Sequence, residues 1–257
     1  MTVAVTGLAI APLKGARLCA VPELRLERSG PVGDRRFLVV DHDDVLLETT
    51  RTPALTQVEP AWDAARGVLR LRFPGGREVE DRVDPGAATR TRSYDGRELP
   101  GRRVEGPLAD ALSAHLGRSV RLLVRDDGVT GADDFPVTLM SGGSLRALAP
   151  ALGGAVPDAR RFRMTIAIDG VEPWAEHGWA GRDVGVGEAV LHVAHPVPRC
   201  VVTTRSPLDG RRDVPVLEAL AALRGKRDVT FGVWCHVVAP GSVRVGDGVR
   251  AGVAGSA

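Results

Sequence analysis

Short apolar runs separated by turn residues dominate the pattern of hydrophobic and polar positions in this chain. Residues 68–73 alternate with a period of two and end at residues 74–76, Pro-Gly-Gly, which predicts a strand and a turn, with residues 79–83 as the partner strand. Residues 84–99 are polar without such a pattern and are expected to be irregular. Further strands are expected over residues 3–11, 18–26, 37–41, 120–124, 137–140, 164–168, 188–193, 231–238 and 243–249.

Helical patterns are fewer. Pro107 suits a first helical position, Leu108 and Leu112 share a face, and Gly117 suits a helix end, so a helix is predicted over residues 107–115. A second helix is predicted over residues 217–223, and Ser144 is expected to cap a third. Strands and helices do not alternate strictly, which argues against a doubly wound parallel sheet. We therefore predict a mainly β fold with a few helices, of the α+β class.

Composition narrows the class of protein. The chain has 257 residues, 44% apolar and 26% charged, as in ordinary globular proteins of one or two domains. The net charge of +2 gives no reason to expect a nucleic-acid partner. No apolar run reaches the ~18 residues of a membrane span, and the first residues lack the features of a signal peptide. Three widely spaced cysteines form neither a disulfide framework nor a zinc motif, which favours a cytoplasmic location.

Cys200 is the leading candidate for chemistry. Pro196 and Pro198 rule out a regular helix before it, and the run of residues 200–204, β-branched from 201 on, predicts a strand that begins at the thiol. The guanidinium of Arg199 would favour a thiolate, which can act as a nucleophile or as a soft metal ligand.

Composition alone leaves other roles open for this cysteine. Free cysteines are among the most buried residues, so Cys200 could be an inert part of the core. It could also form a nucleophilic pair with His195 or His236, although no protease signature surrounds it.

Basic residues recur at the ends of predicted strands. A guanidinium there could hold an oxyanion through two hydrogen bonds, although charged side chains at such places are most often simply solvated. Lysine occurs only twice in the chain, which draws attention to the lysine that lies in a turn near the start. These residues are Lys14, Arg35, Arg36, Arg160, Arg161 and Arg163.

Two further motifs allow both a functional and a structural interpretation. Residues 141–144, Ser-Gly-Gly-Ser, could cradle a phosphate at a helix start, but the motif lacks the ending of a nucleotide P-loop and a plain helix cap is the favoured interpretation. Glu172 and Glu176 could form an acid–base pair, and a turn packed by Trp174 and Trp179 is the alternative.

Taken in order, the motifs resemble those of the MOSC family, the C-terminal domain of molybdenum cofactor sulfurases. The Arg-Cys-x-x-Thr-Thr run at residues 199–204 and the Pro-Gly-Ser-Val-Arg-Val-Gly-Asp run at residues 240–247 are the most specific parts. Residues 12–15 and 33–39 resemble the MOSC N-terminal β-barrel domain. The remaining matches are Phe135-Pro136-Val137-Thr138-Leu139, Ser144-Leu145, Arg163, Trp174-Ala175-Glu176, Trp179 and Phe231-Gly232-Val233-Trp234.

The resemblance implies a smaller N-terminal β-barrel domain over roughly residues 1–120 and a MOSC β-barrel over 121–253. We expect the first 36 or so residues to pack with the second part.

The layout is most similar to that of the amidoxime-reducing components, which implies a molybdenum cofactor, molybdopterin. By this resemblance Cys200 is the metal ligand and the catalytic residue. Departures from the family pattern are Gly15 in place of Ser, Thr165 in place of Asn, and Val197 in place of a second cysteine. The implied cofactor-binding residues are Lys14, Gly15, Arg35, Asp133, Asp134, Phe135, Arg163, Thr165, Pro198, Arg199 and Trp234.

The implied function is that of a molybdenum-dependent oxidoreductase that reduces N-hydroxylated small molecules. The chain lacks a dinucleotide fingerprint and the four closely spaced cysteines of an iron–sulfur site, so its electrons would come from an external redox protein. A small-molecule substrate is expected, with no membrane or nucleic-acid partner. Two alternatives stay open: a sulfur carrier with a persulfide on Cys200, or a MOSC-fold enzyme that has lost the metal cofactor.

Overall fold

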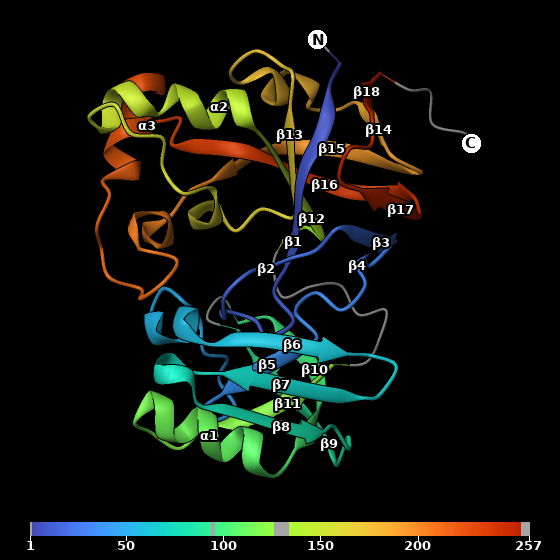
Figure 1. The fold of residues 1–257 in the computed structure, drawn as a ribbon, viewed down its shortest axis with the longest axis vertical. Coiled ribbons are helices and arrows are strands. Elements are labelled where there is room, and N and C mark those ends of the chain that lie inside the picture. Colours follow the sequence, from blue (N-terminus) through green and yellow to red (C-terminus); the bar gives the residue numbers. More distant parts are fainter. Residues whose placement is uncertain (1, 94–95, 126–133, 253–257) are drawn as a thin grey trace.

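A computed structural model describes residues 2–93, 96–125 and 134–252, and it has two units (Figure 1). The C-terminal unit contains an eight-stranded sheet with α2 and α3 beside it, and the N-terminal unit contains two smaller sheets with α1. The predicted mainly β fold with a few helices is confirmed.

The eight-stranded sheet holds the first strand of the chain as well as the last. Its strands pair antiparallel except for β12 and β13, which are parallel, and β1 pairs with β13 through Ala4 opposite Asp169. In order across the sheet, the strands are β18 (Val249–Ala251), β14 (Asp183–Val186), β15 (Ala189–Pro198), β16 (Thr230–Ala239), β12 (Val137–Ser141), β13 (Ile166–Asp169), β1 (Ala4–Ile10) and β2 (Cys19–Ala20).

A three-stranded sheet completes the C-terminal unit. It consists of β17 (Gly241–Arg244), β3 (Glu23–Glu27) and β4 (Gly30–Pro31). Leu24 and Leu26 of β3 pack with Val243 of β17 into the same apolar core as the eight-stranded sheet. Residues 4–31 therefore lie largely with the C-terminal half of the chain.

The N-terminal unit has a four-stranded sheet, β5 (Phe37–Val40), β11 (Arg121–Val124), β10 (Glu98–Val104) and β9 (Ala88–Arg92), and a three-stranded sheet, β6 (Glu59–Asp63), β7 (Val68–Arg72) and β8 (Glu78–Arg82). The predicted hairpin is confirmed, since β7 pairs with β8 through Leu71 opposite Val79. Leu69 and Leu71 are fully buried while Arg70 and Arg72 point outward, as the period-two pattern requires.

The helices match their sequence signals. The predicted helix at Pro107 is confirmed as α1 (Pro107–Leu116), and Gly117 ends it with φ 65°. The second prediction is confirmed as α3 (Val216–Arg224). The others are α2 (Gly142–Ala147) and the 3₁₀ helices η1 (Pro53–Gln57), η2 (Pro74–Gly76), η3 (Ala149–Leu152), η4 (Ala159–Phe162), η5 (Ala175–Trp179) and η6 (Val201–Thr204). In the described ranges, none of the helices is long and apolar enough to span a bilayer.

The expectation that residues 84–99 are irregular is wrong, because they contain β9. Its inward positions are threonines rather than apolar residues. Thr91 is fully buried and donates a hydrogen bond to the carbonyl of Asp44, while Arg90 and Arg92 are exposed. A strand whose buried face is made of threonine gives no hydrophobic alternation to read.

Two smaller expectations are also wrong. Ser141, not Ser144, caps α2, since its hydroxyl accepts the N–H of Ser144 at 3.0 Å. The expected strand over residues 243–249 is interrupted by a turn at Gly246, which has φ 97°. The carboxylate of Asp247 accepts the N–H of Arg244 at 2.7 Å and closes this turn.

Candidate active site

A cavity of about 370 Å³ is lined by residues of both units. This volume falls in the range of small-molecule sites. Most of the residues that the sequence singles out lie on its wall, although they come from distant parts of the chain. These are Lys14, Gly15, Arg35, Asp134, Arg163, Pro198, Arg199, Cys200 and Trp234.

Cys200 directly precedes a 3₁₀ turn, so the predicted strand over residues 200–204 is wrong. The pairing of β15 with β16 shifts register twice near Pro196 and Pro198, and β15 ends there. Cys200 itself is extended and precedes η6. The hydroxyl of Thr203 donates to the carbonyl of Cys200 at 2.9 Å, and Thr204 donates to Val201 at 2.7 Å. These local bonds stabilise the turn against the β propensity of the run.

The three cysteines have different surroundings. Cys200 is exposed at the cavity. Cys235 is fully buried, and desolvation raises the pKa of its thiol to about 12. Burial, followed by the nearby carboxylates of Glu59 and Asp34, raises the pKa of Cys19, whose thiol also donates to the carbonyl of Pro60 at 2.9 Å. Cys200 is therefore the thiol that is available for chemistry.

Two cavity arginines have left-handed backbones, Arg35 with φ 50° and Arg163 with φ 54°. This conformation is unfavourable for residues other than glycine, and such strain concentrates at functional sites. The N–H of Arg35 donates to the carbonyl of Ala11 at 2.8 Å, and its guanidinium pairs with the buried carboxylate of Asp34. The same carboxylate accepts the N–H of Ala11 at 2.7 Å, so one anion joins the segment that follows β1 to the segment that precedes β5.

Lys14 and Gly15 form the neighbouring part of the wall. The N–H of Lys14 donates to the carbonyl of Phe37 at 2.9 Å, and its side chain is largely buried. Gly15 has φ 85°, and a Cβ there would lie 3.0 Å from Leu55 and 3.3 Å from Thr49. Both the backbone angle and the close packing favour glycine at this position.

Arg199 ties the Cys200 turn to the Arg163 turn. Its guanidinium donates to the backbone carbonyl of Phe162, and its Cζ atom lies 5.5 Å from the centroid of the Phe162 ring. Phe162 packs on Phe231 with ring centroids 3.9 Å apart. Because Arg163 directly follows Phe162, the bond from Arg199 helps to fix the strained backbone of its neighbour in the cavity.

Three of the predicted binding residues need separate comment. Thr165 is buried behind the wall and bonds through its hydroxyl to Thr138, at 3.2 Å, and Thr138 lines the cavity instead. Phe135 packs on Trp234 at the cavity edge, with ring centroids 5.3 Å apart. Asp133 lies outside the described residues, and Asp134 pairs with Arg97 at 3.3 Å.

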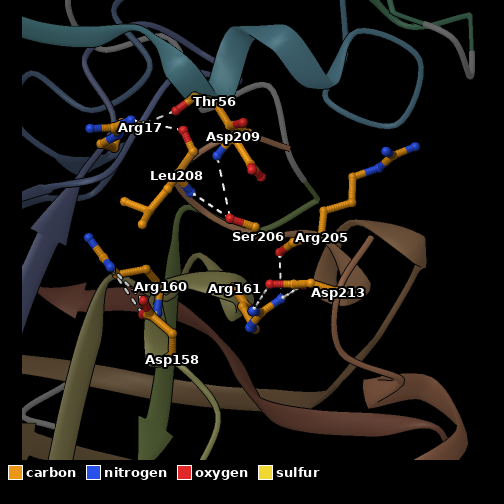
Figure 2. A network of polar contacts seen from close by, with 10 residues as sticks. All are labelled: Arg17, Thr56, Asp158, Arg160, Arg161, Arg205, Ser206, Leu208, Asp209 and Asp213. Carbon is orange, nitrogen blue, oxygen red and sulfur yellow. Dashed lines mark hydrogen bonds and ion pairs between the residues drawn. The ribbon is translucent and has the colours of Figure 1, made fainter. Parts of the chain in front are cut away.

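Arg161 is a cavity residue that the sequence did not assign to the site. Its guanidinium makes two bonds of 2.6 Å to the carboxylate of Asp213 and one of 2.8 Å to the carbonyl of Arg205 (Figure 2). The cluster of basic residues at 160–163 is visible in the sequence, but its pairing with Asp213, 52 residues further on, could not be inferred from it.

The segment of residues 205–213, which we call the strap, connects the Cys200 turn to both units. Arg17 donates to the carbonyl of Leu208 at 3.0 Å (Figure 2), and Gln57 donates to the carbonyl of Asp209 at 3.0 Å. Arg161 bonds the two ends of the strap from the C-terminal side. The strap thereby fixes the position of the thiol relative to both walls of the cavity.

The two ambiguous motifs have structural roles and contact each other. Glu176 is fully buried; it accepts a hydrogen bond from the hydroxyl of Ser144 at 2.9 Å and one from the N–H of Ser141 at 3.3 Å. The start of α2 is therefore occupied by the protein's own carboxylate rather than held open for a phosphate. The backbone N–H of Trp174 donates to the hydroxyl of Ser144 at 2.7 Å, which completes the network.

Comparison with known proteins agrees with this architecture. The model of the MOSC N-terminal beta barrel domain matches residues 2–119, and that of the MOSC domain matches residues 126–250. A molybdenum cofactor sulfurase of Danio rerio is 25% identical over 89% of this chain, and the chain spans about a third of that protein, 31%. Mitochondrial amidoxime-reducing component 1 of Xenopus laevis is 27% identical over 95% of this chain and 81% of its own length.

Among solved structures, the YUAD protein of Bacillus subtilis aligns over 98% of this chain and 96% of its own, with 14% identity and a TM-score of 0.48. The two family models together account for nearly all of the sequence in the expected order. The chain belongs to the MOSC family and carries the MOSC N-terminal beta barrel domain ahead of its MOSC domain.

Proposed function

We propose that this protein binds a molybdenum cofactor in the cavity and reduces N-hydroxylated small molecules there, with Cys200 as the protein ligand of the metal. The observation that carries the proposal is the meeting of an exposed thiol with a basic wall in one cavity.

The donor set of the cavity fits this cofactor. In the described part of the chain, no three His, Cys, Asp or Glu side chains lie together as a metal site. One thiol suits a metal that arrives with its own organic ligands, as it does in molybdopterin. The phosphate of the cofactor needs cations and fixed N–H donors. We assign Lys14, Arg35 and Arg163 to the phosphate side and Cys200 to the metal.

The structure of the wall suits an anionic guest. Arg35 and Arg163 are held by backbone hydrogen bonds in left-handed conformations, so the backbone from which each guanidinium extends is set before any ligand binds. Preorganised cations lose little conformational entropy on binding. When bound, the cofactor supplies a two-electron redox centre beside the Cys200 turn.

The reaction is the reductive cleavage of an N–O bond. Two electrons and two protons convert the N-hydroxyl group to N–H and release water. The electrons come from a separate redox protein, since the sequence has no dinucleotide fingerprint. A relative of similar extent is named an amidoxime-reducing component, which supports this class of substrate.

The test is turnover by protein purified from a host that makes the cofactor. We expect reduction of an amidoxime with reduced viologen as the artificial donor, and none with NADH alone. Activity with NADH and no added partner would contradict the external donor. Molybdenum-loaded protein that is inactive with every donor would contradict the reductase.

A second candidate is sulfur transfer through a persulfide on Cys200. It is favoured by the exposure of this thiol and by relatives named molybdenum cofactor sulfurase. Cyanide releases sulfane sulfur as thiocyanate. Thiocyanate release from the wild type but not from Cys200→Ala, together with the absence of molybdenum, would favour this candidate over the reductase.

A further inference from the structure

Four unsaturated rings lie together on and next to the paired strands β15 and β16, and one of them belongs to the cavity wall. Phe135 lies 5.3 Å from Trp234, 5.1 Å from His195 and 4.7 Å from His236, measured between ring centroids. His195 and Trp234 are 5.0 Å apart with their planes at 87°. We call these four residues the ring platform. Trp234 also lines the Cys200 cavity, so the platform is continuous with it.

The ring platform lies at the edge of the apolar core, which it touches through Trp234. His195 and His236 are exposed and Phe135 and Trp234 are half-buried. The alternate residues of β16, such as Cys235, point to the other face and supply the core. By contrast, the stacked pair of Phe162 and Phe231 is fully enclosed. Burial therefore accounts for the enclosed rings, but not for the two exposed imidazoles that join Phe135 and Trp234 beside the cavity.

The geometry of the ring platform indicates what it can hold. Phe135 and Trp234 are nearly parallel, at 22°, and His195 stands almost perpendicular to both. The Nδ1 atom of His195 lies 3.1 Å from the carbonyl of Pro196, which orients the ring. Rings arranged this way offer faces and edges to another flat π-system, with which offset and edge-to-face contacts are favourable. A saturated ring of similar size gains burial but not these contacts.

We propose that the ring platform is a substrate subsite that selects N-hydroxylated compounds with a flat, unsaturated body over saturated compounds of similar size. The inference rests on the proposed function, because the N-hydroxyl end would have to reach toward Cys200 while the flat body lies on the rings. Trp234 and Cys200 share the cavity wall, so one small molecule can contact both ends.

The first test compares two substrates that differ only in the flatness of the body, a benzene-ring amidoxime and its cyclohexane counterpart. In His195→Leu and His236→Leu, we expect the ratio of kcat/KM for the flat over the saturated substrate to fall roughly 3- to 10-fold. The change should lie mainly in KM for the flat substrate. His42→Leu, which alters an exposed imidazole in a turn of the N-terminal unit, is the matched control. An unchanged ratio in both platform variants would overturn the subsite.

The second test does not depend on turnover. Benzamide, titrated into the protein, should shift the NMR signals of the His195 and His236 rings through its ring current. Cyclohexanecarboxamide, which has no ring current, is the control ligand, and the signal of His42 is the control signal; neither control should show these shifts. Shifts without turnover of any amidoxime would support the subsite and contradict the reductase. Turnover without shifts and without selectivity would contradict the subsite and leave the reductase standing.

Discussion

The cavity wall and the core of the eight-stranded sheet use the same two strands, β15 and β16, yet they place a cysteine in opposite surroundings. Cys235 lies within β16, fully buried, and its pKa is raised to about 12. Cys200 lies just beyond the end of β15, on an exposed turn. The difference shows how strand length controls the accessibility of a thiol: one inside a core strand packs, whereas one just beyond a strand end is open to reaction.

Charge separates the same two regions. The sheet core is apolar, whereas the cavity wall contains buried or half-buried cations that need partners. Asp34 pairs with Arg35, and Asp213 pairs with Arg161. Two of the cavity arginines are therefore compensated by carboxylates, as charges removed from water need to be.

The largest effect that we expect is on thiol reactivity. A thiol with a pKa of about 12 has only about one thiolate in 10⁴ molecules at pH 8, and burial also blocks the reagent. Iodoacetamide should label Cys200 in the native protein and leave Cys235 unlabelled until the protein is unfolded. Mass spectrometry of the peptides measures the labelling of each cysteine, and equal labelling rates would contradict the difference in accessibility between Cys200 and Cys235.

The ion pair of the strap, whose guanidinium is buried, should matter more for stability than a pair whose guanidinium is exposed. Asp213→Asn leaves the buried guanidinium of Arg161 without its carboxylate, and we expect it to lower the free energy of unfolding by roughly 1.5–3 kcal/mol. Asp158→Asn, which breaks the more exposed pair with Arg160, should lower it by less than about 1 kcal/mol. Urea denaturation tests this, and equal losses would show that the strap is not anchored by Arg161.

A smaller effect should report how tightly the strap packs on the N-terminal unit. Gly210 has φ 75°, and an added Cβ would lie 2.7 Å from the carbonyl oxygen of Pro53. Gly153 has almost the same φ, 74°, with no atom within 4 Å. Gly153→Ala should cost about 1 kcal/mol for the left-handed backbone alone, and Gly210→Ala about 1 kcal/mol more. Equal costs would mean that the strap can move away from Pro53.

The smallest effect that we expect is the loss at low pH of the stabilisation from an exposed ion pair, Arg146 with Asp169. Arg146 bonds the Asp169 carboxylate through two contacts of 2.7 Å and lowers its pKa from 3.8 to about 2. The stabilisation is present above pH 3.8 and is lost as the pH falls through 2. The Tm of Arg146→Met should thus lie slightly below that of the wild type at pH 7, and the two should converge near pH 2. A Tm difference that grows as the pH falls would contradict this direction of pH dependence.

Local signals in the sequence predicted local structure well. The hairpin over residues 68–83 and the two longer helices followed from alternation, proline and glycine, because each depends on residues close in the sequence. The cavity residues came from the family resemblance, and the structure brings most of them together.

The errors arose where side-chain bonds outweigh propensity. Thr203 and Thr204 bond back to the preceding carbonyls and curl a β-branched run into a 3₁₀ turn. The role of Arg161 depends on Asp213, at a separation of 52 residues, which no local pattern reveals. Thr165 lies behind Thr138 because the two strands pair in a register that the sequence alone does not specify.

The assignment of Cys200 is tested most directly by the molybdenum content of purified protein. Wild type, Cys19→Ala, Cys200→Ala and Cys235→Ala, all made in a cofactor-producing host, would be compared by elemental mass spectrometry, with circular dichroism to verify folding. We predict about one molybdenum per chain in the wild type and in the Cys19 and Cys235 variants, and loss of the metal in Cys200→Ala. Folded Cys200→Ala with the metal content of the wild type, or wild-type protein without the metal, would contradict the account.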